Sequence, residues 1–123
     1  MRIIIDTHIF LWALSDPKRL SPAQRSLLES MANIIYVSSI SIAEIMIKKS
    51  LGKLEFNEDP LKAAEQSGFE FLDFSATAAV ALGELPYHHK DPFDRMLIAQ
   101  SLEKNYAIMT DDSKFKLYEC KLI

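Results

Sequence analysis

Short runs of β-branched and aromatic residues alternate along this chain with longer segments of helical periodicity. The strand-like runs cover residues 2–5, 34–37, 69–74 and 106–109. The segments between them predict helices over residues 10–14, 22–31, 42–51, 60–67, 76–85 and 92–104. Strands separated by helices form parallel sheets, because each helix carries the chain back to the edge where the strand began. We therefore predict an α/β fold with a mainly parallel central sheet of four to five strands and helices on both faces.

The length of 123 residues, without an internal repeat or a Pro/Gly/Ser-rich linker, fits a single domain over residues 1–123. Residues 121–123 are the candidate fifth strand, at an edge of the sheet. Ser21-Pro22-Ala23-Gln24 predicts a capping box at a helix start, and Gly52 and Gly68 suit the positions after helix ends.

The composition limits the function classes. Cys120 is the only cysteine, which excludes an internal disulfide framework and favours a reduced, cytoplasmic setting. No apolar run approaches the roughly 20 residues that a bilayer span needs, so we expect no membrane segment. With 14 basic and 17 acidic residues the net charge is −3, so binding to nucleic acid would need a local basic rim or a cation held by the acids.

Acidic residues follow several of the predicted strands. Asp6 comes directly after the first strand, Glu44 lies one turn into the helix after the second, and Asp94 lies in the first turn of the last helix. The adjacent acids Asp111 and Asp112 follow the last strand. Because the carboxyl ends of parallel strands meet at one edge of a sheet, these carboxylates are expected to converge there.

Each acid also has a local role open to it. Asp6 could cap the next helix, and Ser41-Ile42-Ala43-Glu44 matches a capping box in which Glu44 could also pair with Lys48. Asp91 is better placed than Asp94 to cap the last helix. Adjacent acids in a loop are ordinarily solvated. Taken singly, these positions leave capping and ligand roles both open.

The joint pattern of acids predicts a metal site. Three or four carboxylates at one edge repel one another unless they are protonated or bridged by a cation. Mg²⁺ favours a few carboxylates with waters, which leaves coordination positions for phosphate oxygens. Such an ion could lower the pKa of a water and neutralise charge on the leaving oxygen. Metal-assisted phosphodiester hydrolysis is therefore the leading chemistry.

A series of motifs runs through nearly the whole chain. They are Asp6-Thr7-His8, Leu11-Trp12, Ser38-Ser39-Ile40-Ser41 leading to Glu44, Gly52-Lys53-Leu54, His88-His89-Lys90-Asp91-Pro92-Phe93-Asp94-Arg95 through Ala99-Gln100, and Thr110-x-Asp112-x-x-Phe115. Together they resemble the PIN-domain ribonucleases, specifically the VapC-type toxins of toxin–antitoxin pairs. The Asp-Pro-Phe-Asp-Arg segment is the most specific of them.

The resemblance implies which acids form the active site. The family's four acidic positions map onto Asp6, Glu44, Asp94 and Asp112, and the Thr-x-Asp spacing favours Asp112 over Asp111. The presence of all four argues against an inactive homologue. The family also implies a Mg²⁺- or Mn²⁺-dependent endoribonuclease, commonly a homodimer, that acts on RNA and is inhibited by a cognate antitoxin covering the active site.

Hydroxyl and basic side chains would complete such a site. Thr7, Ser41 and Thr110 are expected to hold the carboxylates or a metal-bound water by hydrogen bonds. A basic rim that contacts RNA phosphates could include Lys48, Lys53 and Arg95, although Arg95 could instead pair with a nearby acid.

The histidines favour no soft-metal site, since no His-x-x-x-His pair occurs and no cysteine accompanies them. We expect His88 and His89 to shape their loop or to contact phosphate at the rim.

Two other function classes stay open. A Mg²⁺-binding, receiver-like signalling domain has a similar length, but it needs an acid pair after the first strand and an acceptor aspartate after the third, for which Asp73 is the candidate. A non-catalytic module that binds RNA or a protein partner is the other alternative. The sequence does not identify the RNA target, the number of metals or the antitoxin.

Overall fold

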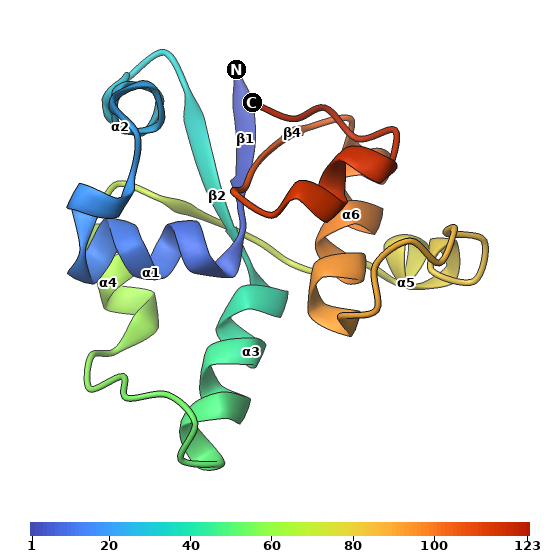
Figure 1. The fold of residues 1–123 in the computed structure, drawn as a ribbon. Helices are drawn as coiled ribbons and strands as arrows, with labels where there is room; N and C mark the ends of the chain where they lie inside the picture. Colours follow the sequence, from blue (N-terminus) through green and yellow to red (C-terminus); the bar gives the residue numbers. More distant parts are fainter.

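One four-stranded sheet organises the computed structural model, which describes residues 1–123 (Figure 1). Its strands are β1 (Arg2–Ile5), β2 (Ile34–Ser38), β3 (Glu70–Leu72) and β4 (Ala107–Met109). They lie in the order β3-β2-β1-β4, and every neighbouring pair is parallel. The predicted α/β class and parallel sheet are confirmed.

The helices follow the predicted alternation with different bounds. They are α1 (Thr7–Ser15), α2 (Pro22–Glu29), α3 (Ser39–Ser50), α4 (Pro60–Gln66), α5 (Ala76–Ala81) and α6 (Pro92–Lys104), with 3-10 turns η1 (Pro17–Arg19) and η2 (Ser113–Leu117). The first and third helices begin three residues earlier than predicted, because the last polar residue before each helix caps it. Asp6 accepts from the Ile9 N–H and Ser38 from the Ile40 N–H. The fifth helix ends four residues earlier than predicted, where its hydrogen bonds tighten to a three-residue spacing.

The predicted helix cap and the two glycine positions are confirmed, whereas the predicted fifth strand is only a single bridge. Ser21 and Gln24 form the capping box of α2, and Gly52 and Gly68 have positive φ angles of 69° and 78° after helix ends. The proposed fifth strand over residues 121–123 amounts to one parallel bridge between Leu122 and Ile108. Pairing that involves a single residue does not make a strand, so the sheet has four.

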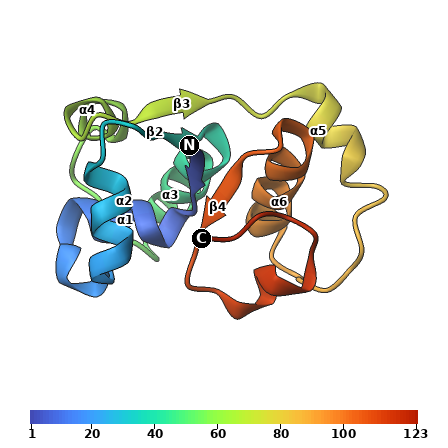
Figure 2. The same ribbon diagram turned by 90° about the horizontal axis from the view of Figure 1, so that it is seen from above.

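The central strand β1 separates two hydrophobic cores. Ile3 and Ile5 face a core with residues of α1, α3 and α4, whereas Ile4 faces a core built from α6 and η2. This alternation follows from the two-residue period of a strand. Figure 2 shows α1, α2 and α4 gathered on one side of β1, and α6 with the C-terminal segment on the other.

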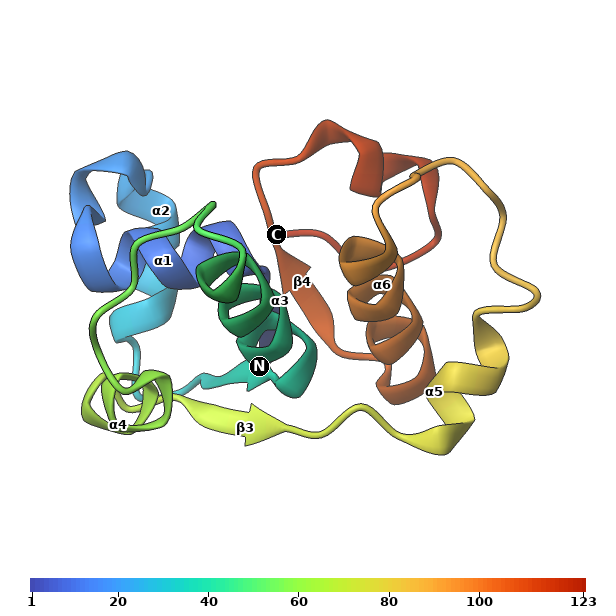
Figure 3. The same cartoon turned by 90° about the horizontal axis from the view of Figure 1, so that it is seen from below.

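Strand order brings α1, α3 and α6 to one edge of the sheet. The chain leaves β1 toward β2 and β3 and returns to the far side of β1 as β4, which makes the carboxyl ends of β1 and β4 a topological switch point. The start of α6 lies beside α3 in the view from below (Figure 3), and the two helices are in contact. None of the helices combines the length and the apolar character needed to cross a membrane.

Candidate active site

Asp6 stands where β1 passes into α1. Its Oδ1 accepts a hydrogen bond from the Ile9 N–H at 2.9 Å, and its Oδ2 accepts one from Thr110 Oγ1 at 2.5 Å. The residue is 3% exposed, and this burial raises the pKa of its carboxyl group. One carboxylate therefore caps a helix and also ties the end of β1 to the loop after β4.

Asp94 lies in the first turn of α6. Asp91 caps this helix, as predicted, by accepting hydrogen bonds from the Phe93 and Asp94 N–H groups at 2.8 and 3.1 Å. The Asp94 side chain is left free to face the other acids. Burial first, and then the charges of nearby carboxylates, raise the pKa of Asp94 to about 8. Those carboxylates belong to Asp91, Asp6, Glu44 and Asp112.

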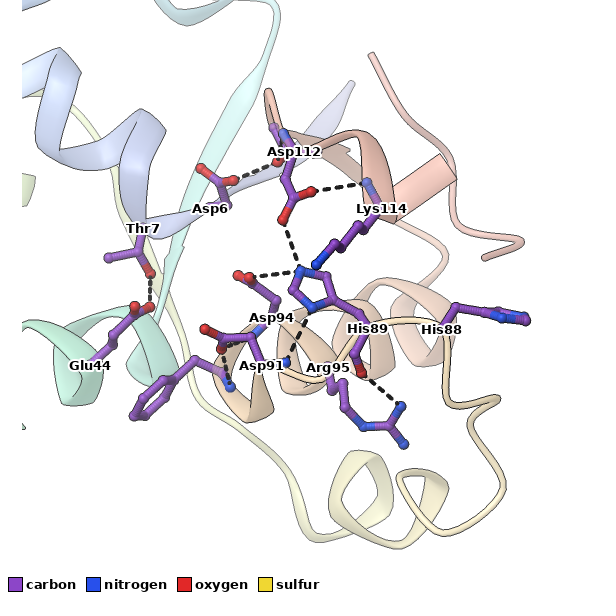
Figure 4. Close-up of polar contacts among 12 residues, drawn as sticks. Asp6, Thr7, Glu44, His88, His89, Asp91, Asp94, Arg95, Asp112 and Lys114 are labelled. Carbon is purple, nitrogen blue, oxygen red and sulfur yellow. Dashed lines mark hydrogen bonds and ion pairs between the residues drawn. The ribbon is translucent and has the colours of Figure 1, made fainter. Parts of the chain in front are cut away.

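Asp112 meets Asp94 through an imidazole. His89 Nε2 lies 2.8 Å from Asp112 Oδ2 and 3.1 Å from Asp94 Oδ2 (Figure 4). One ligand atom from each of these three residues lies within 4.8 Å of the others. Burial acts to raise the pKa of Asp112, but hydrogen bonds from the Lys114 N–H and His89 lower it overall. Asp94, with a raised pKa, and Asp112, with a lowered pKa, therefore both contact the same imidazole nitrogen.

Glu44 faces the same region from α3. Its Oε1 accepts from Thr7 Oγ1 at 2.7 Å, and its Oε2 pairs with Lys48 Nζ at 2.6 Å. The predicted i,i+4 pair is confirmed, but the capping box is wrong, because Ser38 caps α3 and Ser41 is already helical. Ser41 Oγ instead lies 2.9 Å from Thr7 Oγ1. The Thr7 hydroxyl therefore contacts the carboxylate of Glu44 directly, and Ser41 contacts Thr7.

The surface beside the acids is hollowed in two places. One depression of about 300 Å³ is lined by Asp6, His8, Trp12, Asp111 and Asp112. A second, of about 240 Å³, is lined by Thr7, His8, Leu11, Glu44, Ile45, Lys48, Lys53 and Leu54. Asp6 and Asp112 therefore share one hollow, while Glu44 and the two lysines line the next.

Asp111 has a different partner from Asp112. Its Oδ1 accepts from Gln24 Nε2 of α2 at 2.7 Å. It is absent from the three-residue group formed by His89, Asp94 and Asp112. Of these two adjacent acids, only Asp112 belongs to the group with Asp94, although both line the hollow beside Asp6.

The acids of separate elements thus meet at the switch point of a parallel sheet, and residues 3–119 match the family model of the PIN domain. The chain belongs to the PIN-domain family. The match covers nearly the whole chain and spans all four predicted acids, Asp6, Glu44, Asp94 and Asp112.

Solved structures share the PIN fold of this chain. A VapBC2 complex from Rickettsia felis bound to promoter DNA is 23% identical, with 100% of this chain and 98% of the other covered and a TM-score of 0.76. A DNA-bound VapBC complex from Salmonella typhimurium is 18% identical, with 100% and 97% covered and a TM-score of 0.73. A PIN domain endonuclease is 21% identical, with 94% and 74% covered and a TM-score of 0.53. Comparison with curated proteins gives no match.

Arg95 of this PIN domain is not a rim residue. It is 8% exposed, and its guanidinium donates to the carbonyl oxygens of Pro86 at 2.9 Å and Leu85 at 3.2 Å. It also lies over the Tyr87 ring, 4.2 Å from the centroid. The predicted contact between Arg95 and RNA phosphate is therefore corrected to a structural role, because the loop before α6 uses the donors of the guanidinium.

His89 is the site residue that sequence reasoning missed. We expected it in a loop or at the rim, but it is 5% exposed and lies between two of the predicted acids. The only sequence signal was its place two residues before the cap Asp91. Its burial depends on Phe115 and Tyr118, which pack there from the far end of the chain.

Proposed function

We propose that this PIN domain, residues 1–123, is a metal-dependent endoribonuclease and the toxin of a toxin–antitoxin pair. The observation that carries the proposal is the gathering of carboxylates that follow β1 and β4 or lie on α3 and α6, where burial and this crowding raise the pKa of Asp94 to about 8. Such crowding is costly for the protein alone and is relieved when a cation binds. Membership of the PIN-domain family supports nuclease chemistry at these acids.

The donor set fits a hard divalent cation such as Mg²⁺ or Mn²⁺. Carboxylate oxygens are the ligands such ions prefer, and no cysteine lies among them. Asp6, Asp94 and Asp112 would hold the ion, with Glu44 approaching from α3. When bound, the ion would supply an activated water and neutralise charge on the phosphate oxygens.

The remaining polar residues would orient this set. The Thr110 hydroxyl would fix Asp6 and the Thr7 hydroxyl Glu44, while Ser41 would hold Thr7 in place. Lys48 and Lys53 line the hollow next to the acids, where they would contact RNA phosphates. In the cation-free protein Lys48 pairs with Glu44. If a bound cation drew the Glu44 carboxylate away, the Lys48 ammonium would be free to contact a phosphate.

A cognate antitoxin and a homodimer belong to the same proposal. Two of the solved structures that share this fold are described as VapBC complexes bound to DNA. We infer an antitoxin that covers the acids and a cytoplasmic setting for both partners. Size-exclusion chromatography with light scattering, with and without the product of an adjacent small reading frame, tests both assemblies.

Cleavage of single-stranded RNA by the purified protein tests the activity. We expect Mg²⁺-dependent cleavage that EDTA abolishes and that Asp6→Asn and Asp94→Asn each eliminate, while circular dichroism shows an intact fold. Asp73→Asn is the matched control, because Asp73 is an exposed acid after the edge strand β3, two strands away from β1. Undiminished cleavage by the two site variants would refute the assignment.

The same variants separate the alternatives. A receiver-like domain would be phosphorylated at Asp73 by a small phosphodonor, and the distance of β3 from β1 argues against that arrangement. A non-catalytic module would bind RNA without cleaving it at any Mg²⁺ or Mn²⁺ concentration. Mapping of RNA ends after induced expression of the wild type and of Asp6→Asn would identify the target.

A further inference from the structure

The two nitrogens of the His89 ring have different partners. Nδ1 accepts a hydrogen bond from the backbone N–H of Asp91 at 3.2 Å. A ring nitrogen that accepts carries no proton, so the proton of the neutral ring is on Nε2. Nε2 is the atom that faces Asp112 Oδ2 at 2.8 Å and Asp94 Oδ2 at 3.1 Å. The imidazole therefore points a donor, and not a lone pair, at the two carboxylates.

We propose that His89 is a positioning residue that holds the carboxylates of Asp112 and Asp94 at a fixed spacing through its Nε2–H and does not itself coordinate the cation. The inference rests on the proposed function, since it assigns a role within the same site. A nitrogen that bears a proton has no lone pair for a metal. The ring thus acts on the cation only through the two acids.

The surroundings of His89 fix the direction of its Nε2–H. The Tyr118 hydroxyl accepts from the backbone N–H groups of His88 and His89 at 3.0 and 2.8 Å and donates to the Pro86 carbonyl at 2.8 Å. The His89 ring meets Phe115 edge to face, with centroids 5.8 Å apart and planes at 89°. A ring held at its backbone, at Nδ1 and on its face can aim its one donor.

The position of the donor suits two acids that share a cation. An N–H donor between two carboxylates reduces their mutual repulsion. The second oxygen of Asp112 accepts from the Lys114 N–H, whereas the Asp94 carboxylate has no protein partner other than His89. Asp94 therefore keeps an oxygen for the cation while its orientation stays fixed.

Substitutions at His89 test the role of the donor. A Gln amide N–H reaches about as far as imidazole Nε2, whereas an Asn amide reaches only as far as Nδ1. Isothermal calorimetry with Mg²⁺ on the RNA-free protein should show His89→Gln retaining most of the affinity of the wild type. His89→Asn and His89→Leu should each lose about 10- to 100-fold. His88→Leu, on the exposed neighbouring histidine, is the control and should bind as the wild type does.

Nitrogen-15 spectra of the His89 ring test the tautomer without any activity. At alkaline pH, with and without Mg²⁺, we expect a protonated Nε2 and an unprotonated Nδ1. A proton on Nδ1 in either state, or a loss in folded His89→Gln as large as that in His89→Leu, would overturn the proposal. If the wild type bound no Mg²⁺, the proposed function would fail, and the tautomer in the same sample would still support or refute the donor role of His89.

Discussion

At Asp6, one carboxylate serves two neighbours. Its oxygens cap α1 through Ile9 and bind the hydroxyl of Thr110, so the helix start and the candidate site depend on the same side chain. Asp112 also has two partners: one oxygen accepts from the Lys114 N–H of η2, and the other contacts His89 Nε2. Asp94 differs from both, because it caps nothing. Burial and the charges of neighbouring carboxylates raise the pKa of its carboxyl group to about 8.

Asp94→Asn should stabilise the cation-free protein above neutral pH. The folded-state pKa of about 8 lies above the ordinary 3.8, so the folded state retains a proton that the unfolded state has lost. The contribution of Asp94 to stability therefore falls as pH rises from about 4 to about 8. In urea unfolding with EDTA, we expect the variant to gain on the order of 1–2 kcal/mol over the wild type at pH 8 and nothing at pH 4. Equal differences at both pH values would contradict this.

Mg²⁺ should reverse the order of stability of the same two proteins. A ligand that binds only the folded state stabilises it by about 2.7 kcal/mol at a concentration of 100 times its Kd. The wild type should gain this at pH 8, whereas Asp94→Asn, which lacks one proposed ligand, should gain much less. Thermal unfolding with increasing MgCl₂ measures the difference, and CaCl₂ and NaCl at matched ionic strength serve as controls. Equal gains in both proteins would remove Asp94 from the cation site.

The beginning of α6 combines two functions in adjacent residues of one element. Asp91 supplies the cap, and Asp94 faces the other acids. Asp91 also affects Asp94, because after burial its charge is the largest cause of the raised pKa of Asp94. The helix therefore begins with a cap whose charge works against ionisation of its neighbour.

Asp91→Asn and Asp91→Ala should separate the cap from the charge. An Asn oxygen still accepts the Phe93 and Asp94 N–H groups, so its cost should be small, whereas Ala loses the cap and should cost about 1 kcal/mol. Both variants should lower the pKa of Asp94, because both remove a like charge. Urea unfolding measures the change in stability, and carbon-13 titration of the Asp94 carboxyl measures the change in its pKa. A loss in Asn equal to that in Ala would show that the charge, and not the cap, stabilises α6.

The predicted elements were reliable in kind and weaker at their ends. The strand runs and the Asp91 cap were readable because they depend on neighbouring residues alone. The starts of α1 and α3 were missed because Asp6 and Ser38 join strand to helix without an intervening loop. Local sequence patterns therefore identify the type of an element. They do not locate the start of a helix whose cap directly follows or ends a strand.

Across the whole molecule, the candidate site depends on contacts between distant parts of the chain. The Thr110 hydroxyl reaches Asp6, and the Tyr118 hydroxyl holds the loop that carries His89. The convergence of Asp6, Asp94 and Asp112 followed from a parallel sheet and could be predicted. The burial of His89 and of Arg95 could not, because both depend on how the C-terminal segment and the loop before α6 fit together.

Tyr118→Phe should loosen the loop that carries His89. The change leaves two backbone N–H groups without their partner and removes one of the two donors to the Pro86 carbonyl, which should cost about 1–3 kcal/mol. Hydrogen exchange at the amides of His88 and His89 should accelerate. Tyr87→Phe is the matched control, because Tyr87 is 73% exposed on the same loop. Unchanged exchange in Tyr118→Phe would show that other contacts hold the loop.

The hydrogen bond between Thr110 and Asp6 spans 104 positions of the sequence, and β4 pairs with β1 across nearly the same interval. During translation, Asp6, Glu44 and Asp94 are all synthesised before β4 and Asp112. A nascent chain consequently carries three of the four acids but lacks the strand that fixes one of them and the residue that completes the set. If the protein cuts RNA, this order of synthesis keeps the ribosome that makes it away from a finished active site.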